Sequence, residues 1–143
     1  MGEVRVEAVL TNEVDETLAA EGRLAADQVR RYKADALVDT GAVRLVIPQH
    51  VADALGLRVR GTRGVEYTDG RNDPVPVTSS LVIQIAGRDT VEEALILGDE
   101  VLIGQAVLEK TDMYVDCVGQ RLIPNPAHPD QPVTKVKRAA PHG

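Results

Sequence analysis

Two stretches near the start of the chain alternate between apolar and polar positions. Residues 3–10, EVRVEAVL, place Val4 and Val6 on one side and charged side chains on the other, and residues 32–39, YKADALVD, show a similar alternation. Apolar residues at every second position are typical of a β-strand with one buried face. We therefore predict a strand in each stretch.

The segment between these strands has the pattern of a short helix. Asp15 is suited to cap it, because a carboxylate accepts hydrogen bonds from the free N–H groups of a first turn, and Gly22 is suited to end it. A second turn is predicted over residues 25–29. Another short helix is predicted over residues 48–57, which begin with proline and have glycine near their end.

Later segments pair short apolar runs across turn residues, which is the pattern of β-hairpins. The clearest turn signal is Asp69-Gly70, and a second turn is expected at residues 86–89. The sequence predicts three hairpins, over residues 64–80, 81–97 and 113–124.

The order of these elements favours a mainly β fold. A short strand is expected at residues 44–48, and residues 101–112 read as a strand, a glycine and a short helix. Many short strands with few helices are typical of small barrels. We predict a closed β-barrel with two or three short helices in one domain, residues 1–124, followed by a proline-rich tail, residues 125–143.

The composition supports this prediction and reduces the number of possible functional classes. The chain has no Phe or Trp and three Tyr, so its core must be aliphatic and rich in β-branched residues, which favour strands. A net charge of −6 argues against nucleic acid as a partner. The basic cluster Lys135, Lys137 and Arg138 is interpreted as a solvated tail or edge strand.

Several further classes of function are not indicated. Cys117 is the single cysteine, so no disulfide within the chain is possible and a cytoplasmic location is predicted; we expect Cys117 to be packed at a strand end. We see no signal peptide, and no apolar run reaches the roughly 20 residues of a membrane span. No metal-ligand spacing or phosphate loop is present, so no metal, cofactor or membrane partner is predicted.

The residues most suggestive of chemistry surround Asp39. This carboxylate follows an apolar run and leads into Thr40-Gly41-Ala42, a place where it is poorly solvated and needs partners. The apolar-apolar-glycine sequence at residues 102–104 comes about sixty residues later. Between them lies the hairpin with residues 67–70 near its tip. An aspartate in this setting is either a catalytic carboxylate or a turn residue.

In this order the three features resemble the retropepsin-like aspartic proteases. In that family Asp-Thr-Gly is the active-site loop, the hairpin is a flap over the cleft, and apolar-apolar-glycine is the strand behind the loop. The resemblance spans residues 4–124. The helical insert after the first strand and the RLIPNP ending make the chain look more similar to the small bacterial members than to the viral ones.

The resemblance implies a closed barrel of the retropepsin type and an endopeptidase that needs no metal. Two carboxylates about 3 Å apart share one proton, so one can activate water while the other donates to the substrate carbonyl. The chain has one Asp-Thr-Gly, so a homodimer is implied, acting below neutral pH on extended peptides with apolar residues at the cleaved bond. The implied catalytic residues are Asp39, Thr40 and Gly41, and the implied substrate-binding residues are Ala42, Tyr67, Thr68, Asp69, Gly70, Leu102, Ile103 and Gly104.

The chain departs from the viral pattern at positions that lock the loops across the dimer. Val43 and Arg44 stand where an aspartate is common, and Gln105 and Ala106 stand where arginine and an acidic or amide residue are common. The dimer is therefore expected to depend on paired terminal strands, such as residues 4–10 or residues 133–137. These departures keep two alternatives open, which are a non-catalytic peptide- or protein-binding module and a monomeric β-domain.

Overall fold

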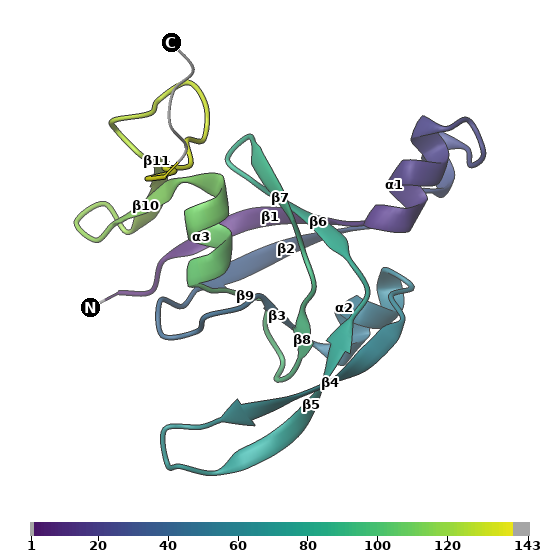
Figure 1. Ribbon diagram of the computed structural model, residues 1–143, viewed down its shortest axis with the longest axis horizontal. Coiled ribbons are helices and arrows are strands. Elements are labelled where there is room, and N and C mark those ends of the chain that lie inside the picture. Colours follow the sequence, from purple (N-terminus) through teal and green to yellow (C-terminus); the bar gives the residue numbers. More distant parts are fainter. Residues whose placement is uncertain (1, 139–143) are drawn as a thin grey trace.

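The computed structural model describes residues 2–138 and shows a mainly β protein with a few short helices (Figure 1). The N-terminal half contains β1 (Arg5–Asn12), α1 (Glu13–Ala20), η1 (Ala26–Gln28), β2 (Arg31–Val38), β3 (Val46–Ile47), α2 (Gln49–Ala54) and β4 (Val59–Glu66). The C-terminal half contains β5 (Asn72–Thr78), β6 (Leu81–Ile85), β7 (Arg88–Glu92), β8 (Leu95–Ile96), β9 (Leu102–Ile103), α3 (Gln105–Thr111), β10 (Met113–Asp116) and β11 (Arg121–Pro124).

Nine of the strands form one curled sheet in the order β4-β5-β8-β3-β9-β2-β1-β6-β7, and β10 and β11 form a separate hairpin. Most neighbours are antiparallel, but β2 with β9 and β3 with β8 are parallel. The order ends at β4 and β7, which do not pair with each other in residues 2–138. The sheet is a half-barrel, so the mainly β class is confirmed and the predicted closure is not.

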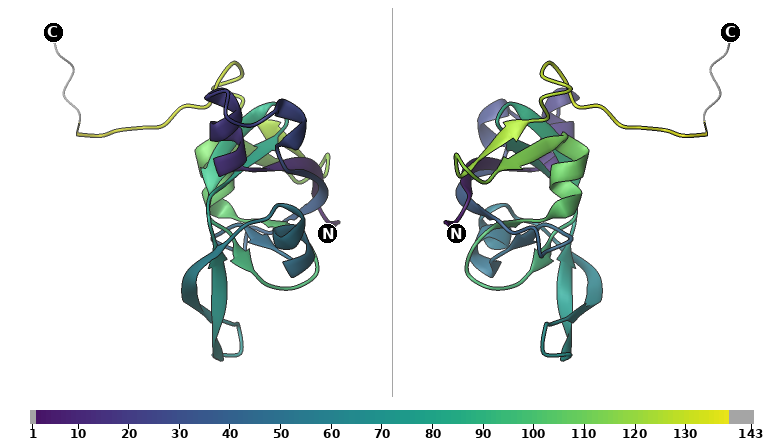
Figure 2. Two further views of the ribbon diagram at one scale, coloured as in Figure 1. Left: turned by 90° about the vertical axis from the view of Figure 1, so that its right-hand side faces the viewer. Right: turned by 90° about the vertical axis from the view of Figure 1, so that its left-hand side faces the viewer.

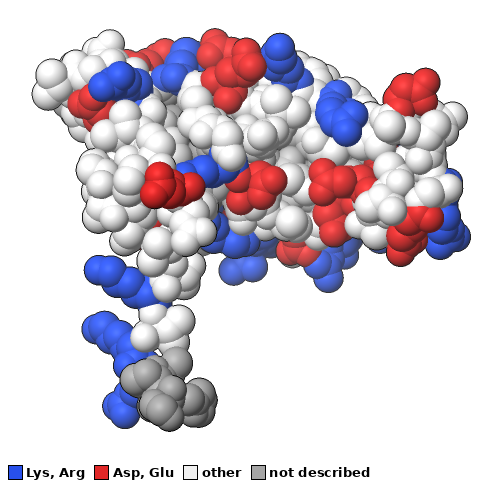
Figure 3. Space-filling view, turned by 90° about the horizontal axis from the view of Figure 1, so that it is seen from above, with Lys and Arg blue, Asp and Glu red and all other residues white. Residues whose placement is uncertain are grey.

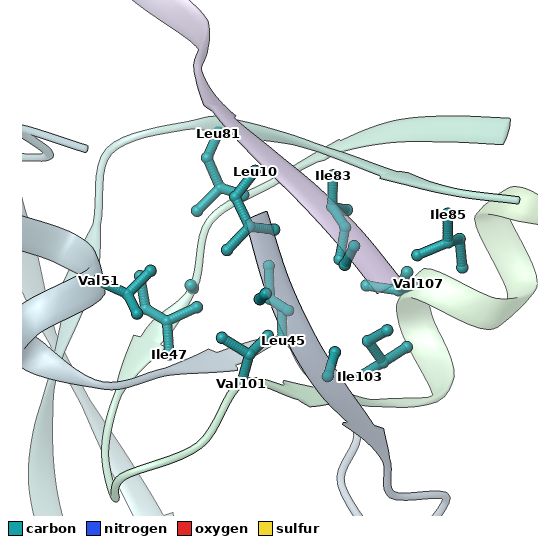
Figure 4. Packing of buried hydrophobic residues seen from close by; sticks show 14 of the residues in the cluster. Leu10, Leu45, Ile47, Val51, Leu81, Ile83, Ile85, Val101, Ile103 and Val107 are labelled. Atoms are coloured by element: carbon teal, nitrogen blue, oxygen red, sulfur yellow. The ribbon is translucent and has the colours of Figure 1, made fainter. Parts of the chain in front are cut away.

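The concave side of the sheet holds an aliphatic core, as expected from a chain without Phe or Trp (Figure 4). Its members come from most strands and from helices α2 and α3, and the largest side chains are fully buried. Burying one such side chain contributes about 1.5–3 kcal/mol. The central residues are Leu10, Leu45, Ile47, Leu55, Leu81, Ile83, Ile85 and Ile103.

Helix α1 begins one turn earlier than predicted. Its N-cap is Asn12, whose Oδ1 accepts a hydrogen bond from the Asp15 backbone N–H at 3.1 Å. Asp15 is therefore not the cap; its buried carboxylate accepts two hydrogen bonds from the guanidinium of Arg30, Nε at 2.8 Å and Nη2 at 3.1 Å. These hydrogen bonds from Arg30 lower the pKa of Asp15. They also join α1 to the residue that precedes β2.

The three predicted hairpins are present, but the second ends at Glu92, and residues 95–96 form β8, which pairs with β3 and β5. The β6–β7 turn has two residues, Ala86 and Gly87, both with positive φ, which suits the twist of a tight hairpin. The β4–β5 hairpin is longer than predicted, because β4 already begins at Val59. Pro74 and Pro76 lie in β5, and a missing N–H is tolerated there because β5 pairs with β8 at one position only.

The segment after β11 is held against α3 before it leaves the body. The Asp112 carboxylate accepts hydrogen bonds from Asn125 Nδ2 at 3.0 Å and from the Val133 N–H at 3.1 Å, and it contacts His128 Nδ1 at 2.6 Å. These contacts, with Asn125 the largest, lower the pKa of Asp112. Buried Arg88 donates to the carbonyls of Asp112 and His128. The division of the chain at residue 124 stays a prediction.

Beyond this anchor the described tail runs away from the body, as Figure 2 shows. Residues 133–137 form no strand in the single chain, so a role as a strand between two copies stays a prediction. The three basic residues 135, 137 and 138 are exposed, as expected. On the face in Figure 3, acidic and basic side chains are interspersed rather than gathered into one basic surface.

The expectation for Cys117 is wrong. Its side chain is exposed in the loop between β10 and β11, because the hairpin turns there and its strands end at Asp116 and begin again at Arg121. None of the described helices has the length and apolar character needed to cross a membrane.

Candidate active site

Asp39 is positioned by the parallel pairing of β2 and β9. Leu37 and Val38 lie beside Leu102 and Ile103, and the Asp39 N–H continues the ladder by donating to the Ile103 carbonyl at 2.9 Å. The strand pairing stops there, because β2 ends at Val38. The apolar-apolar-glycine segment thus lies directly behind the Asp-Thr-Gly loop, as the resemblance implies.

The loop itself is a tight turn closed by the aspartate. Asp39 Oδ1 accepts a hydrogen bond from the Gly41 N–H at 3.0 Å, and the Asp39 carbonyl accepts one from the Ala42 N–H at 3.1 Å. Asp39 is half-buried, whereas Thr40 and Gly41 are exposed. The carboxylate therefore has a fixed orientation while its other oxygen has no hydrogen-bond partner within residues 2–138.

Among the glycines of the site, Gly104 has the least room for a side chain. A Cβ there would lie 2.7 Å from the carbonyl oxygens of both Ala42 and Arg44. At Gly41 a Cβ would lie 3.2 Å from Asp39 Oδ1, which is tight but involves a side chain. The steric demand is therefore sharper at Gly104 than at Gly41.

Helix α3 starts directly behind the loop and holds it from within the same chain. The backbone N–H groups of Gln105 and Ala106 donate to the carbonyls of Ala42 and Val43, both at 2.9 Å. The Gln105 side chain reaches further and donates from Nε2 to the Thr40 carbonyl at 2.7 Å. Gln105, one of the departures from the viral pattern, thus holds the loop through a hydrogen bond to its backbone.

The loop forms one wall of a groove of about 400 Å³ between the body and the β4–β5 hairpin. Figure 1 shows this hairpin extending below the rest of the sheet, with its tip on the same side as the loop after β2. The groove floor is aliphatic, since it includes Val46, Leu95, Leu97 and Leu102. Such a groove has the shape and polarity to receive an extended peptide with apolar side chains.

The structure brings together only part of the predicted site. The predicted residues that line the groove are Asp39, Gly41, Ala42, Tyr67 and Leu102. Those that do not line it are Thr40, Thr68, Asp69, Gly70, Ile103 and Gly104.

The structure explains why each of these six residues does not line the groove. Thr40 opens instead into a second cavity, of about 670 Å³, on the other side of the loop. Residues 68–70 are exposed at the hairpin tip, beyond the groove. Ile103 and Gly104 are buried behind the loop and support it from the rear.

Sequence reasoning missed nine groove residues, which are Val43, Arg44, Val46, Arg63, Gly64, Val65, Glu66, Leu95 and Leu97. Part of this set follows from alternation, because Arg63, Val65 and Tyr67 are every second residue of one strand segment and share a face. The apolar residues 95–97 carried no such signal, since any buried strand has the same composition.

The charged residues of the groove differ in how they are held. Arg44 donates to the Glu93 carbonyl at 3.2 Å and lies 3.8 Å from its carboxylate. At the hairpin tip, the Arg71 guanidinium stacks over the Tyr67 ring at 4.6 Å.

Among residues 2–138, no three His, Cys, Asp or Glu side chains are arranged to hold a metal ion.

Comparison with known proteins agrees with this geometry. A family model described as "gag-polyprotein putative aspartyl protease" matches residues 27–110, which is more than half of the chain. The retroviral protease-like domain of Ddi1 from Leishmania major has a TM-score of 0.53 and 17% identity, over 88% of this chain and 90% of that chain. The solution structure of Simian Foamy Virus (mac) protease has a TM-score of 0.46 and 19% identity, over 73% and 90%. No curated protein matches the chain.

The fold and the loop therefore define a retropepsin-like domain, which confirms the resemblance seen in the sequence. The chain belongs to the gag-polyprotein aspartyl protease family. The Ddi1 domain supports the shared fold. A place among the small bacterial members stays a prediction.

Proposed function

We propose that this protein is a homodimeric aspartic endopeptidase that cleaves extended peptides. The observation that carries the proposal is the position of Asp39, half-buried at the wall of an aliphatic groove and oriented by the Gly41 N–H. The family match supports the same chemistry. The groove would hold the peptide, and the hairpin would cover it.

The chemistry needs a second carboxylate, which one chain does not provide at this site. Nothing but Asp39 and Glu66 contributes a carboxylate to the groove within the described chain, and Glu66 belongs to the hairpin rather than to the loop. A two-fold axis beside the loop would bring a second Asp39 next to the first. Two such groups share one proton and titrate as a unit, so that one serves as base and the other as acid.

Thr40 and the second cavity support this position for the proposed axis. Thr40 is exposed and lines the second cavity but not the groove, and Asp39 borders both cavities. In the proposed dimer Thr40 faces the partner loop, while the aliphatic floor of each groove accepts apolar side chains on either side of the cleaved bond.

The test is cleavage of a diverse peptide library by wild-type protein at mildly acidic pH. Asp39→Asn should abolish cleavage, because a dimer of this variant has two amides in place of the carboxylate pair and cannot activate water. Asp89→Asn, at an exposed position of β7, is the matched control and should cleave at the wild-type rate. Cleavage that survives Asp39→Asn would show that the activity has another source.

One observation favours the alternative of a non-catalytic peptide-binding module. The loop is already held within a single chain by Gln105 and by the first N–H groups of α3, so its conformation does not require a partner. Under this alternative the wild-type protein and Asp39→Asn would bind the same peptides and neither would cleave them.

A further inference from the structure

Arg63 is an exposed arginine that lines the groove and has no ion-pair partner among residues 2–138. Arg63, Val65 and Tyr67 line the groove from alternate positions of the hairpin's first strand and its end. Arg63 is paired in register with Val75, which is 3% exposed and packs with the aliphatic residues beneath the hairpin. Because residues opposite each other in a strand pair share a face, Arg63 stands on the side of the hairpin that faces the groove.

The neighbouring arginines each have an interaction partner within the chain. Arg60 forms an ion pair with Glu93, Arg44 is bonded to the same residue, and Arg71 stacks on Tyr67. Arg63, in contrast, has no ion-pair or hydrogen-bond partner among residues 2–138. A free guanidinium at the wall of an apolar groove pairs best with a carboxylate, which it can bind through two parallel hydrogen bonds.

The position of Arg63 sets where such a carboxylate would lie. It is four residues from Tyr67 along the chain, which corresponds to about 13 Å at the rise of an extended strand. An extended peptide has the same rise, so a side chain that faces Arg63 lies roughly four residues from one that lies against Tyr67. Glu66, next to Tyr67, also lines the groove and repels a carboxylate that lies there.

We infer that Arg63 makes this protein select peptides with an acidic side chain roughly three to five residues from the one that lies against Tyr67. The inference rests on the proposed function for its peptide ligand and adds a charged outer position to the apolar central ones. In a two-fold dimer the two copies of Arg63 lie at opposite ends of the groove. The preference should then appear on both sides of the cleaved bond.

The experiment uses fluorescent ten-residue peptides with a central Leu-Val pair and Asp, Ala or Lys placed singly at each outer position. Cleavage is measured with wild-type protein, and binding is measured by anisotropy with Asp39→Asn. Arg63→Glu is introduced into both proteins. Arg58→Glu is the matched control, because Arg58 is exposed at the base of the same hairpin, carries the same charge and does not line the groove.

Wild-type protein should prefer Asp over Lys at an outer position by about two- to five-fold, the size expected of a partly solvated ion pair. Arg63→Glu should reverse the preference, and Arg58→Glu should leave it unchanged. Added salt should weaken it. Equal thermal unfolding midpoints of the two variants would show that Arg63→Glu still folds.

The outcomes separate the two proposals. Cleavage without any preference between Asp and Lys overturns the role of Arg63 and leaves the proteolytic function standing. Binding that prefers Asp and reverses in Arg63→Glu, with no cleavage by wild-type protein, supports Arg63 and overturns the proteolytic function. A preference that Arg58→Glu changes as much as Arg63→Glu also overturns the inference, because it would reflect the overall charge of the hairpin.

Discussion

At Gly104 a single missing side chain allows two backbone segments to meet. Its φ of −92° is open to any residue, so its backbone conformation does not require glycine. The requirement comes from two carbonyl oxygens of the loop that lie where a Cβ would be. The strand behind the loop can therefore support Asp39 only if it presents a bare backbone.

Gly104→Ala should destabilise the protein by about 1–3 kcal/mol and reduce cleavage, because the loop must move to admit the methyl group. Gly61→Ala is the control, since nothing lies within 4 Å of a Cβ there. Urea unfolding at neutral pH measures the difference. Equal free energies of unfolding for the two variants would show that the loop can move without cost and does not depend on its close approach to Gly104.

At the scale of elements, helix α1 is joined to the body by Asp15 and Arg30. The Arg30 side chain lowers the pKa of the Asp15 carboxyl, so the charged form stabilises the fold. A lowered pKa means that this contribution is complete above the ordinary value of 3.8 and is lost as pH falls through the lower, folded value. The helix should therefore loosen in acid.

Asp15→Asn should lower the free energy of unfolding by about 1 kcal/mol at pH 7, since the Arg30 side chain is half exposed and the pair is partly screened. The difference from wild type should shrink as pH falls below about 4. Urea unfolding between pH 7 and pH 3 tests this, with the exposed Asp27→Asn of η1 as control. A difference that stays constant with pH would contradict the role of the charge.

Local signals were sufficient for most elements. The three hairpins, the turn at residues 67–70 and the end of α2, where Gly56 has a φ of +63°, all follow from residues close in sequence. The two-residue strands β3, β8 and β9 do not, because they exist only through pairing with distant segments. The same limit explains the start of α1, where Asn12 and Asp15 are equally good caps in isolation.

The candidate site shows the same division. The motifs at Asp39 and at residues 102–104 were visible in the sequence, and their contact through the Ile103 carbonyl follows from the family resemblance. The groove wall was less visible, because Arg63 and Leu95 come together only when the hairpin folds over the body. The Gln105 contact with Thr40 was unexpected, since in sequence it appeared only as a missing arginine.

At the scale of the whole molecule, the sheet is open and the chain carries one copy of the motif. The unpaired edges at β4 and β7 and the exposed Thr40 leave surfaces that a second copy can cover. A net charge of −6 makes two copies repel each other weakly, so we expect association to strengthen with salt. Without the viral locking charges, the active form should depend on protein concentration.

The central claim is that two Asp39 carboxylates from two chains form one active site, and mixing subunits tests it most directly. Wild-type protein is equilibrated with increasing amounts of Asp39→Asn, and peptide cleavage is measured at constant total protein. If both chains are required, an equal mixture should retain about one quarter of the wild-type rate, because only wild-type pairs are active. A rate that falls in simple proportion to the wild-type fraction, to about one half, would mean that each chain acts alone and would contradict the account.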